Sequence, residues 1–380
     1  MDSIRNIVAM GDGKCGKTTL TEAMLYNAGA IKRLGSVADG TTVSDYDNEE
    51  IKRQCSINTT LEAINWKDLK YNVIDTPGFF DYAGDVKAGV RAADSALIVL
   101  SGRSGVSVGT EQVYEYAKNK DIPIMFFVNK IDDNRASYEK TLEEMKAVFG
   151  KAVTPFVYPI REGDEFKGFE TVKLITVAPE TEGAEEFIKN TDAVVCLGHT
   201  DADYETAMKA ARAGARCLTH TFNAMPPLHH RQPSLIGAAF DSDMYAQVIC
   251  DGKHIHPSAI RILYKLFGAD RMVLISDSMR ATGLADGDYE LGGLTITVKD
   301  KTARTQDGAL AGSTSTLFEC VRCAIEFGIP EKDAFKMASE IPARLMGLNR
   351  GVIETGRDCD LIILNDKNEV DTVIIGGRIM

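Results

Sequence analysis

Residues 11–18 read GDGKCGKT, and this stretch decides the fold of the first half of the chain. It follows a short apolar run at residues 4–10 and opens a helical segment that begins KTTLTEAML. Gly11, Gly16, Lys17 and Thr18 fit the pattern G-x-x-x-x-G-K-[ST] in the strand-to-helix context that this motif requires. Backbone N–H groups of such a loop surround phosphate oxygens, the lysine reaches the β and γ oxygens, and the hydroxyl binds Mg²⁺. The stretch therefore predicts a phosphate-binding loop.

Two further motifs follow later apolar runs of the first half. Asp75 and Gly78 lie in KYNVIDTPG, where a carboxylate suits the Mg²⁺ shell and a backbone N–H suits the γ-phosphate. The run IPIMFFV ends in Asn129, Lys130 and Asp132, an N-K-x-D tetrapeptide. Its carboxylate can accept from N1–H and N2–H₂ of guanine, a donor pair that adenine lacks. Three motifs in this order on alternating strands and helices predict a P-loop domain that binds GTP.

These motifs and their surroundings resemble the N-terminal GTPase domain of translational GTPases of the elongation factor G group, over residues 1–168. The segment 41–61, TTVSDYDNEEIKRQCSINTTL, resembles the first switch of that family, whose Mg²⁺-binding threonine falls on Ser56. The resemblance therefore implies a Mg²⁺ site formed by Thr18, Ser56 and Asp75. The residues expected to bind GTP are Gly11, Asp12, Gly13, Lys14, Cys15, Gly16, Lys17, Thr18, Thr19, Asp75, Gly78, Asn129, Lys130 and Asp132.

The resemblance has two departures. After the D-T-P-G motif the family has a histidine that orients the attacking water, whereas Phe79 stands here. Phenylalanine neither accepts nor donates a proton, and the elongation-factor-G-like paralogues resemble this chain in having an aromatic residue there. Beyond residue 168 the family's closing strand and helix, its last guanine-contacting loop and its ribosome-binding domains have no counterpart. We therefore expect no productive contact with the ribosome.

A different sequence pattern begins at residue 172, in which apolar runs alternate with helical segments such as YETAMKAARAGA. This alternation predicts a parallel barrel or a doubly wound sheet. All six histidines lie in this half, and His199, His220, His254 and Asp277 follow successive apolar runs. Because strand ends converge on one rim of a barrel, these side chains can share a pocket. Two neutral imidazoles there suit Zn²⁺ or Fe²⁺, and a carboxylate beside them can take a proton from water.

Residues 171–380 are similar to N-acetylglucosamine-6-phosphate deacetylases of the amidohydrolase superfamily. The similarity rests on strings such as VAPE, CDGKHIHP, LISDSMRATGL and LAGSTSTL. It implies metal ligands at His199 and His220, and a base at Asp277 that activates water and then protonates the departing amine. It further implies that His254 polarises the acetyl carbonyl or binds the sugar. The residues implied in recognition of a sugar 6-phosphate are Asn223, the backbone of Ala224 and Arg231, and the loop 312–316 is expected to line the pocket.

Part of the deacetylase pattern is missing from the sequence. The family's H-x-H pair cannot lie upstream, because no histidine precedes His199, and the family's glutamate ligand has no counterpart. The metal would keep two protein ligands, so we expect weak affinity. Five barrel strands of eight would leave two unpaired edges. The segment 351–380 reads as a β-hairpin from a small sandwich that also lacks its partner strands.

The composition sets outer limits. With 44% hydrophobic residues, 26% charged residues and a net charge of −12, the chain is typical of a folded acidic protein, without a bulk attraction for nucleic acid. The eight scattered cysteines and the start MDSIRNIVAM favour a cytoplasmic protein, and we expect no membrane span. Cys320 and Cys323 form a C-x-x-C without a second pair, which favours a helix face over a zinc site.

The two resemblances predict a mixed α/β chimera: an incomplete GTP-binding domain at 1–168, a partial amidohydrolase barrel at 171–350 and the hairpin at 351–380. One hypothesis is a module that binds GTP and Mg²⁺, fused to a Zn²⁺- or Fe²⁺-dependent deacetylase of N-acetylglucosamine 6-phosphate. The alternative is a fusion of two gene fragments, of any origin, that retains GTP binding only or neither activity. A homodimer through the barrel half also remains open.

Overall fold

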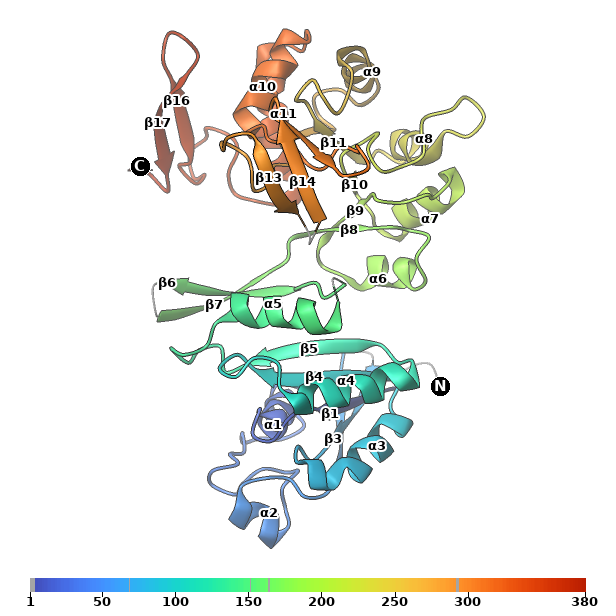
Figure 1. Ribbon diagram of the computed structural model, residues 1–380, viewed down its shortest axis with the longest axis vertical. Helices are drawn as coiled ribbons and strands as arrows, with labels where there is room; N and C mark the ends of the chain where they lie inside the picture. Colours follow the sequence, from blue (N-terminus) through green and yellow to red (C-terminus); the bar gives the residue numbers. More distant parts are fainter. Residues whose placement is uncertain (1–3, 68, 151, 163–164, 292–293) are drawn as a thin grey trace. The chain divides into compact units, whose positions relative to one another are not determined.

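The computed structural model describes residues 4–67, 69–150, 152–162, 165–291 and 294–380, and it divides into two compact units (Figure 1). The first unit is Met1–Thr171 and the second is Val172–Met380. Among the described residues, no helix is both long enough and apolar enough to cross a membrane.

The first unit is built on a five-stranded sheet in the order β2-β3-β1-β4-β5, in which β2 is antiparallel to β3 and the other pairs are parallel. A separate antiparallel pair, β6 and β7, follows the last helix. The strands are β1 (Ile4–Met10), β2 (Thr60–Trp66), β3 (Leu69–Asp75), β4 (Ser95–Ser101), β5 (Ile124–Asn129), β6 (Val157–Glu162) and β7 (Glu165–Thr171). The helices are α1 (Lys17–Asn27), α2 (Asn48–Arg53), η1 (Phe80–Tyr82), α3 (Ala83–Ala92), α4 (Val108–Lys120) and α5 (Tyr138–Phe149).

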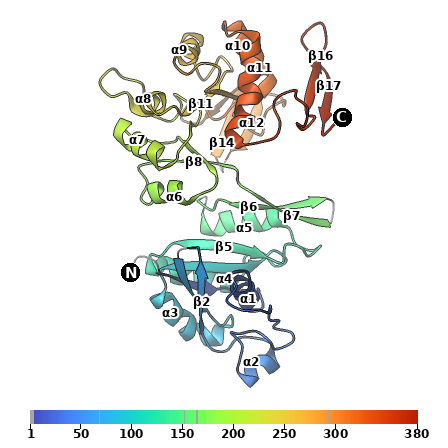
Figure 2. The ribbon, with the colours of Figure 1, turned by 180° about the vertical axis from the view of Figure 1, so that it is seen from behind.

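Helices cover both faces of this sheet, so β1 is buried on both sides (Figures 1 and 2). Val8 and Met10 pack with side chains of α3 and α4 in one core cluster. Ala9, which points the opposite way in the two-residue repeat of a strand, packs with Leu25 of α1 in another. The helices thus fix the carboxyl ends of β1, β3 and β5, where the three predicted motifs lie.

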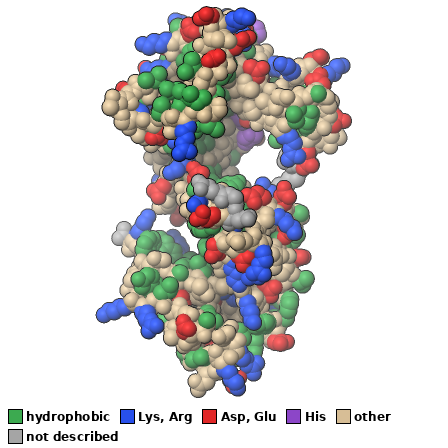
Figure 3. All heavy atoms as spheres, turned by 90° about the vertical axis from the view of Figure 1, so that its left-hand side faces the viewer, with side chains coloured by type: hydrophobic (Ala, Val, Ile, Leu, Met, Phe, Trp, Pro, Cys, Tyr) green, Lys and Arg blue, Asp and Glu red, His purple; other side chains and the backbone are tan. Residues whose placement is uncertain are grey.

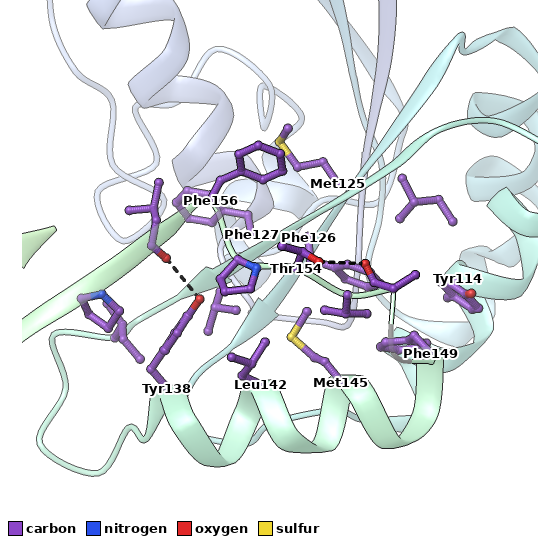
Figure 4. A pocket seen from close by; sticks show the side chains of 18 of the residues that line it. Tyr114, Met125, Phe126, Phe127, Tyr138, Leu142, Met145, Phe149, Thr154 and Phe156 are labelled. Atoms are coloured by element: carbon purple, nitrogen blue, oxygen red, sulfur yellow. Dashed lines mark hydrogen bonds between the residues drawn. The ribbon is translucent and has the colours of Figure 1, made fainter. Parts of the chain in front are cut away.

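A cavity of about 690 Å³ lies along β5, α5 and residues 152–157 (Figure 4). Among the described residues that line it, none is acidic or basic. Its hydroxyl groups include that of Tyr138, which donates to the carbonyl oxygen of Val157 at 3.1 Å. The lining therefore suits neither a phosphate nor a metal ion, and the polar sites lie elsewhere.

The second unit contains a parallel sheet in the order β12-β11-β10-β9-β8. The prediction of five parallel strands joined by helices is thus confirmed. Within the described ranges, neither β8 nor β12 has a second neighbour in the sheet. The strands are β8 (Leu174–Val177), β9 (Val194–Leu197), β10 (Cys217–Leu218), β11 (Tyr245–Ile249) and β12 (Met272–Ile275). The helices are α6 (Ala184–Asn190), α7 (Tyr204–Ala213), α8 (Ser234–Asp241), α9 (Pro257–Phe267), α10 (Leu317–Glu326), α11 (Glu331–Ala338) and α12 (Glu340–Met346).

Two small antiparallel sheets complete the second unit. The first is β13 (Gly287–Leu291), β14 (Leu294–Lys299) and β15 (Thr302–Thr305), between β12 and α10. The second is β16 (Leu361–Leu364), β17 (Val370–Ile375) and β18 (Arg378–Ile379). The expected C-terminal hairpin is thus β16 and β17, and β18 adds a short third strand.

Basic and acidic side chains are interspersed on the face seen in Figure 3. Cys320 and Cys323 lie on α10, with Cys320 buried, in line with the expected helix face.

Candidate nucleotide and metal sites

The phosphate loop joins β1 to α1 and is closed around the Lys17 side chain. Lys17 is 5% exposed, and its Nζ donates to the carbonyl oxygens of Gly11 at 3.2 Å and Asp12 at 3.1 Å. Gly16 has φ 104°, and a Cβ there would lie 2.2 Å from Nδ2 of Asn129. Only glycine fits this position, because it tolerates both the positive φ and the close approach.

The N-K-x-D segment contacts the phosphate loop directly. Asn129 Nδ2 donates to the carbonyl oxygen of Cys15 at 2.9 Å, and Lys130 Nζ donates to that of Lys14 at 2.7 Å. Two of the predicted guanine-contacting residues thus brace the loop that would hold the phosphates. The ends of β1 and β5 form one continuous site.

Asp132 and its neighbour Asp133 have different surroundings. Within the described parts of the chain, the exposed Asp132 side chain has no hydrogen-bond partner. Asp133 is held by Arg135, with contacts of 3.1 and 3.2 Å, and by Arg103 at 3.3 Å. The hydrogen bonds from Arg135 lower the pKa of Asp133 to about 2. Asp132 is therefore the carboxylate free to accept hydrogen bonds from a base.

The three predicted Mg²⁺ ligands lie at one end of the loop. Thr18 Oγ1 is 3.0 Å from Ser56 Oγ. Asp75 is 1% exposed, and among the described residues neither of its carboxylate oxygens has a hydrogen-bond partner. Burial raises the pKa of Asp75 to about 6, although Lys17 and Thr18 oppose the shift. A buried carboxylate without a partner is costly, and Mg²⁺ prefers oxygen ligands, so these residues fit that ion.

Asp45 is a candidate that the sequence did not single out. It is 3% exposed, and both of its carboxylate oxygens also lack a hydrogen-bond partner in the part of the chain that the structure describes. Burial raises its pKa, and the neighbouring Ser56 opposes the shift. It shares with Ser56 a cavity of about 190 Å³ beside the phosphate loop. The signal was present in TTVSDYD, but the sequence gives no means of distinguishing the buried Asp45 from Asp47.

Phe79 lines the same cavity and is 40% exposed. Its ring packs against Gly13, where an added Cβ would lie 2.9 Å from the ring. Gly78, just before it, could carry no side chain either, because a Cβ would lie 2.5 Å from Lys17 Nζ. The site thus has an apolar ring where the family resemblance places a water-orienting histidine.

In the second unit, His199 and His220 meet beyond the ends of β9 and β10. Their Nε2 atoms are 2.8 Å apart. His199, His220 and Asp277 have φ values of 49°, 30° and 49°. Left-handed backbone at non-glycine residues is uncommon, costs energy and clusters at functional sites. Burial, and next the neighbouring His199, lower the pKa of His220, which favours the neutral imidazole that can bind a metal.

Asp277 and the loop 312–316 lie together at the end of β12. The backbone of Asp277 accepts from the N–H of Ser313 at 2.7 Å, and the carbonyl oxygen of Ser313 accepts from Met279 at 2.8 Å. The charge of Asp277 acts to raise the pKa of His220, but burial and His199 outweigh it, so the pKa is lowered overall. Asp277 thus follows β12 as the two histidines follow β9 and β10.

A family model described as the elongation factor Tu GTP-binding domain matches residues 2–259, and one described as the amidohydrolase family matches residues 184–380. The chain belongs to both families. The two matches overlap at residues 184–259, which lie in the second structural unit. These families imply a guanine nucleotide with Mg²⁺ and, in general terms, a divalent metal.

Relatives of both kinds are found. The N-acetylglucosamine-6-phosphate deacetylase of Bacillus subtilis (strain 168) is 38% identical over 249 residues, which cover 59% of this chain and 63% of that protein. The elongation factor G-like protein of Mycobacterium tuberculosis (strain ATCC 25618 / H37Rv) is 38% identical over 160 residues, 42% of this chain and 22% of that protein. The chain thus spans less than two thirds of either relative.

Two solved deacetylase structures match most of this chain. The N-acetyl-D-glucosamine-6-phosphate deacetylase of Mycobacterium smegmatis has a TM-score of 0.53 and 28% identity, and the match covers 78% of this chain and 74% of that one. The deacetylase of Thermotoga maritima also has a TM-score of 0.53, with 27% identity over 79% of this chain and 82% of that one. The predicted chimera of a GTPase-type domain and an amidohydrolase part resembling these deacetylases is confirmed.

The candidate metal site of the amidohydrolase half has few ligands among the described residues. Among the residues that the structure describes, no group of three or more His, Cys, Asp or Glu side chains is placed to hold a metal ion. The two imidazoles suit a divalent ion, but a protein zinc site normally has three or four ligands. The donor set among the described residues is therefore short for such a site.

His254 is paired with a carboxylate that the sequence analysis missed. Its Nδ1 donates to Asp251 at 2.7 Å, and the side chains of His254 and Asp251 are 6% and 1% exposed. Burial raises the pKa of Asp251, but the hydrogen bonds from His254 and from backbone N–H groups outweigh it and lower the pKa to about 2. The spacing D-x-x-H after an apolar run was the available signal. Asp251 fixes the ring so that Nε2 is the free nitrogen.

The predicted phosphate-recognition residues of the amidohydrolase half differ in their contacts. Asn223 Nδ2 donates to the carbonyl oxygen of His220 at 3.1 Å, and Ala224 accepts from the N–H of Thr200 at 3.1 Å. The exposed Arg231 contacts His230 Nε2 at 2.9 Å. Asn223 and Ala224 thus brace the two histidine loops, whereas Arg231 lies on an exposed turn.

Proposed function

We propose that the GTPase half binds GTP and GDP together with Mg²⁺. The observation that carries the proposal is the 3.0 Å contact between Thr18 and Ser56 beside the unpartnered carboxylate of Asp75. Thr18 and Ser56 would hold the ion with Asp75 nearby, and the ion would neutralise charge on the β and γ phosphates. Lys17 would leave its two carbonyl partners for the phosphate oxygens.

The base would lie against Asn129, Lys130 and Asp132. A free carboxylate at Asp132 accepts two hydrogen bonds from guanine, and adenine would leave it unpaired. Phe79 supplies no hydrogen-bonding group for an attacking water. We therefore propose nucleotide binding with slow turnover rather than rapid hydrolysis.

The test is saturable binding of a fluorescent GDP analogue to the full chain. Lys17→Ala and Asp132→Asn should abolish or strongly weaken binding. Lys120→Ala, which removes an exposed charge at the end of α4, should leave it unchanged. Equal binding by all four proteins would reject the proposal.

The His199–His220 pair favours a second activity, in the amidohydrolase half. We propose weak binding of Zn²⁺ or Fe²⁺ there and hydrolysis of the acetamide of N-acetylglucosamine 6-phosphate to acetate and an amine. Such an ion would make bound water more acidic. Asp277 would take a proton from the attacking water and pass it to the departing nitrogen. His254, oriented by its contact with Asp251, would face the acetyl oxygen with Nε2, and Asn223, the backbone of Ala224 and Arg231 would receive the phosphate.

This second proposal predicts acetate release that depends on added Zn²⁺ or Fe²⁺ and is lost in Asp277→Asn. Asp366→Asn, at an exposed position between β16 and β17, is the matched control. Absence of release at saturating metal would leave the alternative of a fusion that only binds GTP, or that has neither activity. A homodimer through the barrel half, a cytoplasmic location and a lack of ribosome binding remain proposals, the first of which sedimentation equilibrium would test.

A further inference from the structure

Glu22 is a fully buried carboxylate that the proposed nucleotide chemistry does not use. It lies on α1 and is 0% exposed. Its Oε2 accepts from the N–H of Gly35 at 3.0 Å, and its Oε1 accepts from the N–H of Val43. One side chain of α1 thus holds two points of the irregular segment between α1 and α2.

The position of Glu22 on α1 links this anchor to the proposed Mg²⁺ site. Thr18 is four residues before Glu22, so the two side chains project from the same face of the helix. Val43 is two residues before Asp45, whose buried carboxylate has no hydrogen-bond partner among the residues described. A single helix face therefore carries both a proposed Mg²⁺ ligand and the anchor of the segment that brings Asp45 to it.

The fit around Glu22 is close. A Cβ on Gly35 would lie 2.5 Å from Glu22 Oε2 and 2.6 Å from the carbonyl oxygen of Thr41. Thr42 and Ser44, which flank Val43, are 7% and 1% exposed. Thr42 and Ser44 are thus buried next to this anchor without belonging to a helix or strand, although Val43 itself is 42% exposed. The carboxylate satisfies backbone donors that would otherwise be unpaired.

A second buried carboxylate, that of Glu50 on α2, also accepts hydrogen bonds from backbone N–H groups on both sides of its helix. Glu50 is 0% exposed, and its Oε1 accepts from the N–H groups of Ile57 and Asn58, both at 2.9 Å. Its Oε2 accepts from the N–H of Asp47 at 3.1 Å. Ile57 follows Ser56 directly, so Glu50 fixes the residue that places the Ser56 hydroxyl beside Thr18.

We propose that Glu22 is a positioning residue that holds residues 35–45 against α1, so that Asp45 stands beside Thr18 and Ser56 before Mg²⁺ and nucleotide bind. The inference rests on the proposed GTP and Mg²⁺ binding. Order in the segment before binding lowers the conformational cost of forming the metal site. Loss of the anchor should therefore affect the Mg²⁺-dependent part of nucleotide retention more than the Mg²⁺-independent part.

The test compares wild type with Glu22→Gln and Glu22→Ala in the full chain. Glu22→Gln keeps the shape but replaces one acceptor oxygen with a donor group. Glu111→Gln, an exposed carboxylate in the first turn of α4, is the matched control. The first readout is the release rate of a fluorescent GDP analogue in Mg²⁺ and in EDTA, and the second is amide hydrogen exchange of peptides covering residues 35–45 and β4.

We expect Mg²⁺ to slow release in the wild type and in Glu111→Gln. In both Glu22 variants the ratio of the two rates should fall at least tenfold, while release in EDTA changes less than twofold. Exchange of residues 35–45 should accelerate at least tenfold, with β4 unchanged. An unchanged rate ratio, unchanged exchange at 35–45, or equal acceleration in β4 would overturn the proposal.

The two exchange regions also separate this inference from the proposed function. If the wild type binds no GDP analogue, GTP binding is rejected and the exchange experiment alone decides whether Glu22 holds the segment. Faster exchange confined to residues 35–45 would then support the anchor. Unchanged or global exchange would reject it.

Discussion

Thr18 Oγ1 and Ser56 Oγ lie 3.0 Å apart, although 38 positions separate them in the chain. Thr18 is fixed by α1, and Ser56 lies in the segment after α2 that Glu50 holds. Two hydroxyl oxygens at this separation, next to buried Asp45 and Asp75, form a set of hard oxygen donors. Because every member is a hydroxyl or a carboxylate, the set suits Mg²⁺ better than a softer metal.

Ser56→Ala should weaken the Mg²⁺ dependence of GDP retention about tenfold, because it removes one oxygen ligand. Ser56→Thr keeps the hydroxyl and should retain it. The measurement is the Mg²⁺ concentration at which release of a fluorescent GDP analogue is half slowed. Equal values for Ser56→Ala and wild type would exclude Ser56 as a ligand.

Asp132→Asn should reduce GDP affinity by about 10- to 100-fold, since a hydrogen bond to a charged group contributes about 1.5–3 kcal/mol. Asp133→Asn should change it less than threefold, because Asp133 is engaged by Arg103 and Arg135. Titration of both variants with the fluorescent analogue tests the difference. Equal losses would show that this acidic pair acts by charge rather than by hydrogen bonds to the base.

Local motifs predicted the GTPase half well, because the phosphate loop, Asp75 and the N-K-x-D segment each depend on a few neighbouring residues on a strand end. The parallel strands of the second half were also predictable, from apolar runs ending in polar residues. Asp45, Glu22 and Asp251 were not predicted, since their roles depend on burial and on partners that only tertiary packing supplies. The role of Arg231 in phosphate recognition stays a prediction from the family pattern, and its side chain contacts His230.

Asp251→Asn should destabilise the amidohydrolase half at neutral pH but not in acid. The pKa of Asp251 is lowered from 3.8 to about 2 in the folded state, so ionised Asp251 favours folding above pH 4. This contribution, about 2 kcal/mol, is lost as the pH falls through about 2. Hydrogen exchange of β11 peptides in urea, compared at pH 7 and near pH 2, measures it. A gap between variant and wild type that is equally large at both pH values would contradict the assignment.

His199→Ala should lower the affinity of the full chain for Zn²⁺ at least tenfold, because one imidazole alone is a weak ligand. His229→Ala is the control, since His229 and His230 form an exposed ring pair with centroids 4.2 Å apart. Competition with a chromophoric chelator gives both affinities. If His229→Ala has the larger effect, the ion binds at the exposed pair instead.

Phe79→His should raise the rate of GTP hydrolysis at least tenfold, since a correctly placed acid or base typically contributes about 10²- to 10⁴-fold. The Phe79 ring lines the cavity at the phosphate loop and packs on Gly13, so an imidazole in its place would face the γ-phosphate side with a nitrogen. Phe80→His is the matched control, because Phe80 is 55% exposed and starts the following helical turn. Single-turnover hydrolysis with prebound GTP separates chemistry from release, and GDP affinity should change less than threefold in either variant. An equal rate in Phe79→His and wild type would mean that another missing element, rather than the aromatic ring, limits hydrolysis.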